Sequence, residues 1–301
     1  MTRHITMQVF RMVLLAGALL AGLPGCTENP FSKEKVSALG SREVRGRVVL
    51  ESGVTPKGVY IWLEGFSLGT YTDENGAFKL TLPPPNSQVT PGGVSGTFKL
   101  YGYLANYDLA TAQLFTQNGE FVYDKGALDK SGELRNPLAL IRRLFIDTEV
   151  VPAAVPANYG DTVKVHIALR AVDDAKRVTV DFPNTCRDRD CPSPAYRVGA
   201  VFLRKIGASE VVVVQMVPDA EAHYIVTVGF SPVTCKMFFR MRDVKLSPGK
   251  YEVIPYLLID DKTIPRALLE TLGDSVRDLV PDYLKYPLQR DGGRFEVKST
   301  P

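Results

Sequence analysis

The chain has 301 residues and a mass of 33.1 kDa, a length that predicts about two domains. Apolar residues make up 45% and charged residues 23%, which is the composition of a globular protein. The 36 basic and 33 acidic residues leave a net charge of +3, so we expect no nucleic-acid partner. These totals say how the protein is built, but they name neither a ligand nor a reaction.

The N-terminus is predicted to be a targeting segment rather than part of the fold. Arg3 and Arg11 make it positive, and the apolar run over 12–23 is shorter than the ~20 residues that span a bilayer. Leu23-Pro24-Gly25-Cys26 follows and resembles the lipobox of bacterial lipoproteins. The resemblance implies that residues 1–25 are a signal peptide and that Cys26 is lipidated. An ordinary signal peptide is the alternative.

The lipid is expected to be the membrane anchor, because no other part of the sequence has about 18 consecutive apolar residues. Residues 26–43 are polar and predict a flexible tether. By resemblance to lipoproteins, Thr27 after the lipidated position favours the outer membrane in a bacterium with two membranes. We therefore expect a lipid-anchored protein of the cell envelope.

Short alternating apolar runs, broken by glycine and proline, begin after this tether. Such runs predict β-strands. The expected strands of the first folded part are 44–50, 59–63, 77–82, 96–104 and 120–123.

Turn residues within this part follow a family pattern: Gly46, Gly58-Val59, Thr72-Asp73, Gly76 and Phe78. The pattern resembles that of the carboxypeptidase regulatory-like domain. The resemblance implies a transthyretin-like β-sandwich over residues 44–125. In bacterial envelope proteins, domains that resemble this one serve as spacers, docking modules or saccharide binders.

The second folded part is also expected to be β-rich. Residues 126–148 are predicted to be a connector, in which 138–146 fits either a strand or a short helix. Residues 149–262 are predicted to form an immunoglobulin-like sandwich, because short strand patterns recur with turns between them. The expected strands are 162–169, 177–182, 198–203, 211–217, 224–230, 235–241 and 251–259.

In the tail, residues 263–301, the spacing of the apolar residues changes from that of a strand to that of a helix. Leu268, Leu272, Val276 and Val280 recur at i+4 and predict an amphipathic helix over 264–280. We expect this helix to pack on the second sandwich, with partner docking as the alternative, and a closing strand over 294–298. The predicted fold class is therefore all-β, with two β-sandwich domains and one C-terminal helix.

Cysteine usage predicts one local disulfide. Lipidation would use Cys26, which leaves an odd number of cysteines in an oxidising compartment. We expect a bridge between Cys186 and Cys191 and a buried thiol at Cys235. A bridge from either of the first two to Cys235 is the alternative.

Catalytic patterns are weak. Zinc carboxypeptidases need an H-x-x-E pair, but His166 and His223 are followed at +3 by leucine and valine. The G-x-S-x-G match around Ser67 precedes a turn and a strand, whereas a nucleophile elbow leads into a helix. Both histidines are predicted to face solvent. No metal or cofactor motif is found, so we expect no cofactor and no enzymatic activity.

Tyr101 and Tyr103 share one face of a predicted strand and are candidates for stacking on a sugar. Their exposure in a shallow groove would favour saccharide binding, and their burial would exclude it. The function expected first is a non-catalytic docking, scaffolding or binding module with an envelope protein as partner. A carbohydrate-binding surface lipoprotein is the first alternative, and an unrecognised envelope hydrolase is the second.

Overall fold

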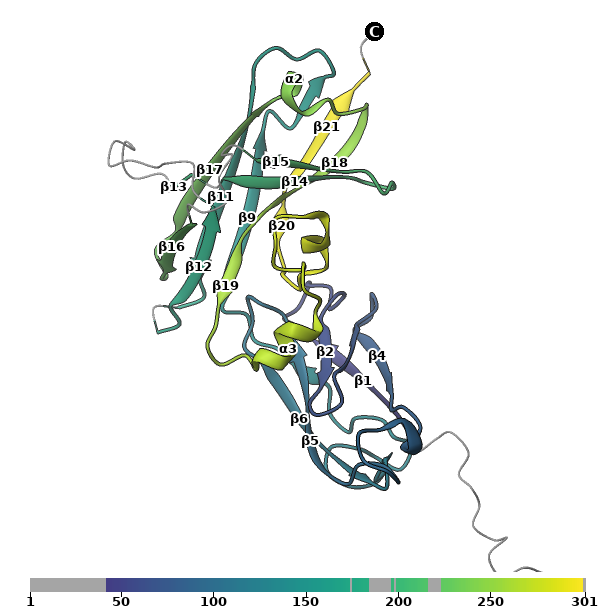
Figure 1. Cartoon of the computed structure of the whole chain (residues 1–301). Helices are drawn as coiled ribbons and strands as arrows, with labels where there is room; N and C mark the ends of the chain where they lie inside the picture. Colours follow the sequence, from purple (N-terminus) through teal and green to yellow (C-terminus); the bar gives the residue numbers. More distant parts are fainter. Residues whose placement is uncertain (1–41, 174, 184–195, 198, 216–222, 300–301) are drawn as a thin grey trace, which may run out of the picture. The chain divides into compact units, whose positions relative to one another are not determined.

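The computed structural model describes residues 42–173, 175–183, 196–197, 199–215 and 223–299, all within the compact unit Gly40–Pro301 (Figure 1). The predicted signal peptide, Cys26 and nearly all of the tether lie outside the described residues. The predicted all-β class is confirmed, because strands make up most of the regular structure. In the described part of the chain, no helix has the length and hydropathy of a membrane span.

Two sheets enclose the first core. One has the order β4-β1-β8 and the other the order β3-β2-β5-β6-β7. Their strands are β1 (Glu43–Val49), β2 (Tyr60–Leu63), β3 (Leu68–Tyr71), β4 (Ala77–Thr81), β5 (Gly96–Tyr103), β6 (Ala110–Gln117), β7 (Glu120–Phe121) and β8 (Leu138–Ala139). A short 3-10 helix, η1 (Pro85–Ser87), follows β4. Alternation along β1 places Val44 and Val48 in the core beside Ile61 and Leu63 of β2.

The turn before β4 explains the glycine of the family pattern. One carboxylate oxygen of Asp73 accepts hydrogen bonds from the backbone N–H groups of Asn75 and Ala77, both at 2.9 Å. Gly76 has a φ of 76°, and a Cβ there would lie 2.4 Å from the carbonyl oxygen of Val48. Only glycine fits this position without strain.

Residues 126–140 differ from the connector expected for them. Leu128, Leu134, Leu138 and Leu140 are buried in the first core, and β8 pairs in parallel with β1. The leucines of this segment are spaced irregularly among polar residues. Their spacing therefore matched neither the strand period nor the helix period, and the sequence did not indicate that they are buried.

The second core lies among three sheets, with the orders β10-β21-β18-β14-β15, β13-β17-β11-β9-β20 and β16-β12-β19. Along β11 (Thr162–Ala171) the predicted alternation holds, and Val163, Val165, Ile167 and Leu169 are fully buried. The other strands are β9 (Leu144–Val151), β10 (Ala154–Pro156), β12 (Val178–Pro183), β13 (Tyr196–Arg197), β14 (Ala200–Lys205), β15 (Val211–Gln215), β16 (His223–Val228), β17 (Val233–Arg240), β18 (Gly249–Pro255), β19 (Leu258–Asp260), β20 (Asp291–Gly292) and β21 (Arg294–Lys298). A single helical turn, α2 (Met241–Val244), follows β17.

The long C-terminal helix is not formed, so that prediction is wrong. Helix α3 (Arg266–Thr271) is followed by Gly273 at a φ of 118°, and then by the 3-10 helix η2 (Pro281–Lys285). Leu268, Leu272 and Val276 are nevertheless buried. The i+4 spacing therefore predicted burial correctly at these three positions, but Val280, the fourth, is 39% exposed, and the helix ends at Thr271. The predicted closing strand is β21.

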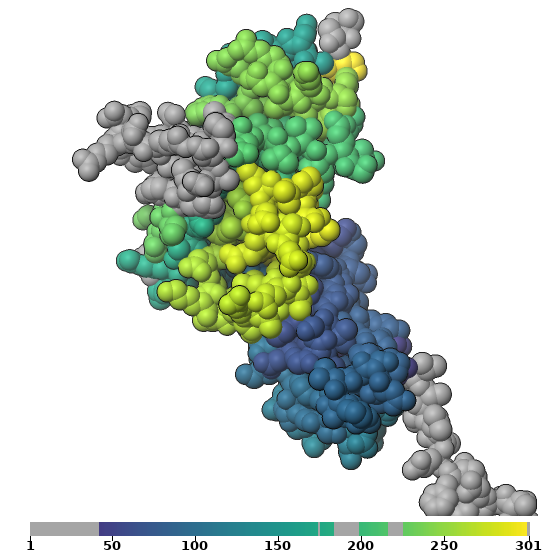
Figure 2. All heavy atoms as spheres, viewed as in Figure 1, coloured from purple at the N-terminus to yellow at the C-terminus, as the bar shows by residue number. Residues whose placement is uncertain are grey.

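The segment between β19 and β20, residues 261–290, contacts both cores. Leu268 and Leu272 belong to one buried cluster with Tyr60 and Trp62 of β2 and with side chains of the second core. Figure 1 places α3 beside β2, and Figure 2 shows these C-terminal residues in direct contact with N-terminal ones. The segment packs on the first part as well as on the second sheet system, which the sequence had not indicated.

Candidate functional site

The two candidate sugar-stacking tyrosines lie beneath this C-terminal segment. Tyr101 pairs with Trp62 and Tyr103 with Tyr60 across β2 and β5, and the rings of Trp62 and Tyr101 are 5.3 Å apart. Tyr101 is 6% exposed and Tyr103 is 3% exposed. Neither ring has a face open to a ligand, so the prediction of a stacking site at these residues is wrong.

The hydroxyl groups of this tyrosine layer join the C-terminal segment. The hydroxyl of Tyr60 donates to the carbonyl oxygen of Thr271 at 3.2 Å, and those of Tyr103 and Tyr286 are 3.4 Å apart. Burial raises the pKa of Tyr103, and the neighbouring Tyr286 raises it further. Tyr103 and Tyr286 therefore both act as neutral packing groups.

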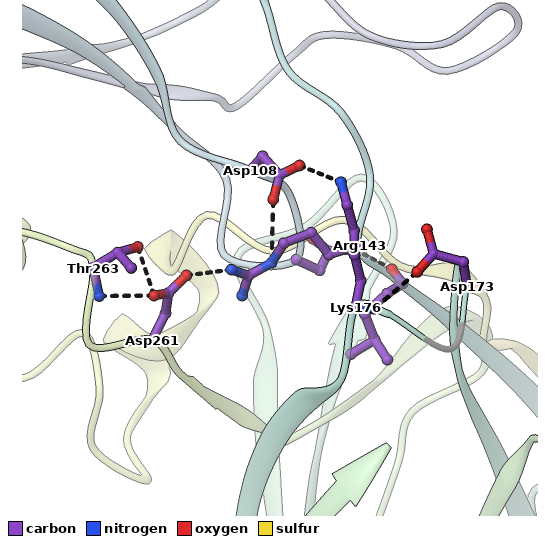
Figure 3. Close-up of polar contacts among 8 residues, drawn as sticks. Asp108, Arg143, Asp173, Lys176, Asp261 and Thr263 are labelled. Carbon is purple, nitrogen blue, oxygen red and sulfur yellow. Dashed lines mark hydrogen bonds and ion pairs between the residues drawn. The ribbon is translucent and has the colours of Figure 1, made fainter. Parts of the chain in front are cut away.

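A polar network lies where the two cores meet (Figure 3). Asp108, which follows the end of β5, accepts a hydrogen bond from Lys176 Nζ at 2.6 Å. Its other oxygen is 3.9 Å from Arg143 Nε, a distance that is electrostatic rather than a hydrogen bond. Arg143 Nη1 donates to Asp261 at 2.5 Å. Four charged side chains from distant parts of the chain thus balance one another.

Asp261 is the most enclosed acid of this network, with a side chain that is 11% exposed. Burial acts to raise the pKa of its carboxyl group, but hydrogen bonds from Thr263 and the charge of Arg143 outweigh burial and lower the pKa below its ordinary value. A carboxyl group with a lowered pKa stabilises the fold above its ordinary pKa, and this contribution is lost as the pH falls through the folded value. The network is therefore intact at neutral pH.

Arg142 occupies a second polar cluster and is only 6% exposed. Its Nε donates to the Tyr107 hydroxyl at 2.9 Å and forms an ion pair with Glu51. Its Nη1 reaches Asp291 at 3.4 Å. Two carboxylates and a hydroxyl thus satisfy this buried guanidinium, and they come from both parts of the chain.

Asn106 supplies the third connection and is fully buried. Its amide nitrogen donates to the carbonyl oxygens of Leu144 and Gln289 at 2.9 and 3.0 Å. Its amide oxygen accepts from the backbone N–H of Gln289 at 3.0 Å. Sequence reasoning missed both Asn106 and Arg142. Each of the two is a polar residue within an apolar run of the sequence, which could have marked it as buried. The sequence did not indicate which groups it would bind.

The predicted thiol at Cys235 is buried and free in the structure, as expected. Cys26, Cys186 and Cys191 lie outside the described residues, so the lipidation and disulfide predictions stay predictions.

Cys235 is expected to resist alkylation until the protein unfolds. Burial raises the pKa of its thiol to about 12, which leaves little thiolate at pH 8. In a variant that keeps Cys235 as its one cysteine (Cys26→Ser, Cys186→Ser and Cys191→Ser), maleimide labelling should be about a thousandfold slower in buffer than in guanidinium. Native labelling at the unfolded rate would contradict the observed burial.

The remaining candidate residues are dispersed. Ser67 lies in the turn between β2 and β3 at a φ of 49°, and a strand rather than a helix follows it. His166 is half exposed, with Nδ1 3.8 Å from a carboxylate oxygen of Glu149. The side chain of His223 lies outside what the structure describes. Among the described residues, no group of three or more His, Cys, Asp or Glu side chains is placed to hold a metal ion.

An open apolar groove lies near Arg142. It encloses about 390 Å³ between the end of β1, β8 and the start of β9. Its walls include Val49, Ile141 and Phe145, and Val172 closes one side. Ile141 is 62% exposed and Val49 is 37% exposed.

No protein-family model and no curated protein matches the chain. Among solved structures, BcpA, the major pilin subunit of Bacillus cereus, is 14% identical, with a TM-score of 0.25 over 71% of this chain and 64% of that chain. The Bacillus anthracis TIE protein is 10% identical, with a TM-score of 0.22 over 74% of this chain and 31% of that one. The chain thus spans less than two thirds of each, and neither likeness is close enough to carry a function to it.

Proposed function

We propose that the protein is a lipid-anchored, non-catalytic docking module of the cell envelope. The observation that carries the proposal is the packing of residues 261–290 on both β cores. Asn106, Arg142 and Arg143 add polar contacts across the same boundary. A module built in this way holds its surfaces in a fixed arrangement, which specific docking requires.

The N-terminal pattern supports the location. Lipid on Cys26 would attach the module to a membrane, and the tether over 26–43 would let it reach a partner beyond the surface. In a bacterium with two membranes, Thr27 favours the outer one. The turn at Asp73 and Gly76 agrees with the resemblance to carboxypeptidase regulatory-like domains, some of which serve as docking modules.

An envelope protein is the partner that we favour over a saccharide. The saccharide hypothesis depended on Tyr101 and Tyr103, and both rings are covered by the protein's own C-terminal segment. The exposed apolar groove instead offers aliphatic walls, which suit a polypeptide side chain.

Replacing Cys26 with serine is expected to release the protein from the membrane. Loss of the acyl chains removes the proposed anchor, because a single serine side chain cannot hold a protein at a bilayer. The measurement is detergent-phase partitioning of the full chain from cells, with radiolabelled palmitate to report acylation. Wild type should label and enter the detergent phase, whereas Cys26→Ser should do neither.

The matched control is Cys235→Ser, which removes a thiol that is buried in the fold. It should remain labelled and membrane-bound. If Cys26→Ser also stayed in the detergent phase, the lipid anchor would be rejected.

A further inference from the structure

A second pocket, of about 300 Å³, lies between residues 284–290 and the first core. Hydrogen bonds join its two walls. The hydroxyl of Tyr71 donates to the carbonyl oxygen of Lys285 at 2.9 Å, and the N–H of Ala105 donates to the carbonyl oxygen of Pro287 at 2.7 Å. The shape of the pocket is therefore set by the same contacts that fix the C-terminal segment on the first core.

The charged side chains that line this pocket are all positive. Lys57, Lys285 and Arg290 line it, whereas no aspartate or glutamate among the described residues does so. Both lysines are exposed and lie at the mouth, while Arg290 is half-buried inside. Each lysine also has an acidic neighbour outside the pocket, Glu74 for Lys57 and Asp282 for Lys285. Because an ammonium group has three N–H donors, each lysine keeps donors for a ligand.

The fold leaves the charge of Arg290 without an anionic partner. Its Nη1 atom is buried and has no hydrogen-bond partner among the described residues, none of which forms an ion pair with it. The guanidinium carbon instead lies 5.9 Å from the ring centre of Tyr283. Burial lowers the pKa of Arg290, and the charges of Tyr283 and Glu252 offset only part of this effect. Glu252 itself bonds to Arg204. A buried cation in this state is stabilised when an anion binds beside it.

We propose that this pocket binds a phosphate group, with Arg290 as the inner contact and Lys57 and Lys285 at the mouth. The planar fork of an arginine matches two phosphate oxygens, and lysine adds point charge. Three cationic side chains can each bond a separate oxygen of a phosphate monoester, whereas a carboxylate has only two oxygens. The volume holds a phosphate with a small substituent, because small-molecule sites begin at about 300 Å³. This inference does not depend on the proposed docking function.

The test is calorimetric titration of the purified full chain, in neutral detergent, with glycerol 3-phosphate. Ionic strength is held constant, because salt screens exposed charges. We expect one site per chain and a melting temperature that rises with ligand concentration, because a ligand of the folded state stabilises it. Acetate is the comparison and should bind about tenfold more weakly or less.

Variants of the lining residues then assign the site. Arg290→Gln should weaken binding about tenfold or more, because a charge-assisted pair is lost. A double variant, Lys57→Gln with Lys285→Gln, should also weaken it, and both changes are at exposed positions that leave the fold intact.

Lys79→Gln is the matched control. The Lys79 side chain is 57% exposed and paired with Glu43, just as Lys57 is 59% exposed and paired with Glu74, but Lys79 does not line the pocket. This variant should bind glycerol 3-phosphate as the wild type does.

A phosphate monoester occurs both in soluble metabolites and in the headgroup of phosphatidic acid, and a competition experiment separates the two sources. Micelles that contain phosphatidic acid are added to the complex with glycerol 3-phosphate. Displacement at a lower phosphate concentration than that of glycerol 3-phosphate itself would identify the headgroup as the ligand, and no displacement would identify a soluble ester. Both results support the phosphate site.

Three outcomes would overturn the proposal. The first is no heat of binding and no rise in melting temperature with glycerol 3-phosphate. The second is acetate binding as tightly as the phosphate ester. The third is an affinity that Arg290→Gln leaves unchanged, or that Lys79→Gln lowers equally, since the latter would show a general effect of positive charge. None of these outcomes bears on the docking function, so the two proposals fail separately.

Discussion

Replacing Tyr283 with alanine is expected to lower the free energy of unfolding by about 3–5 kcal/mol. Tyr283 of η2 is fully buried, and its ring is stacked on Phe202 of β14 at 5.2 Å. Its hydroxyl accepts a hydrogen bond from the Leu257 N–H at 3.0 Å and donates to the Leu257 carbonyl at 2.7 Å. The alanine variant leaves both a cavity and unpaired backbone groups.

The measurement is urea denaturation followed by the fluorescence of Trp62. This residue is the only tryptophan of the chain and lies in the same buried cluster as Tyr283. Tyr283→Phe separates the two contributions, because it keeps the ring and loses the hydroxyl, at an expected cost of about 1–3 kcal/mol. An alanine variant no less stable than the phenylalanine variant would show that the ring stacking contributes nothing.

A loss of this size matters for the whole molecule, because domains are typically stable by only about 5–15 kcal/mol. Tyr283 belongs to the segment that covers Tyr101 and Tyr103. If that segment detached, the tyrosine layer would become exposed apolar surface. The apparent sugar-binding face of the sequence is therefore better understood as the inner side of an intramolecular contact.

Local patterns were sufficient to predict the parts of the fold that depend on neighbouring residues. The alternation over 163–169 identified β11 and its buried face correctly, and Gly76 identified a turn. By contrast, β3 and β6 were not predicted. Their sequences LGTY and ATAQLFTQ mix small and polar residues, so the pairing with β2 and β5 sets their structure rather than their own hydrophobic period.

Features that depend on distant residues were not predictable. Burial of Tyr101 and Tyr103 requires a segment that begins about 160 residues later in the chain, and single-strand periodicity contains no such information.

The other large effect is expected at Asn106. Asn106→Leu keeps a side chain of similar size but removes the Asn106 partner of three backbone groups, the buried carbonyl oxygen of Leu144 and the part-buried carbonyl oxygen and N–H of Gln289. Because an unpaired buried group costs about 1–3 kcal/mol and the part-buried groups add to it, we expect a loss of about 3 kcal/mol in the free energy of unfolding. Urea denaturation measures it. Asn86→Leu, at an exposed position of η1, is the control and should change stability by less than about 0.5 kcal/mol.

Asn106→Asp adds a test by pH. An aspartate here would face the carbonyl oxygens of Leu144 and Gln289 without an amide to donate to them, and burial would raise the pKa of its carboxyl group. A group whose pKa is raised in the folded state destabilises the fold above its unfolded pKa and less so when protonated. The aspartate variant should therefore recover stability relative to Asn106→Leu as the pH falls from 7 toward the ordinary pKa of aspartate, about 4. If the difference between the two variants were the same at every pH, the site would be open to water and the polar connection through Asn106 would not hold the two cores together.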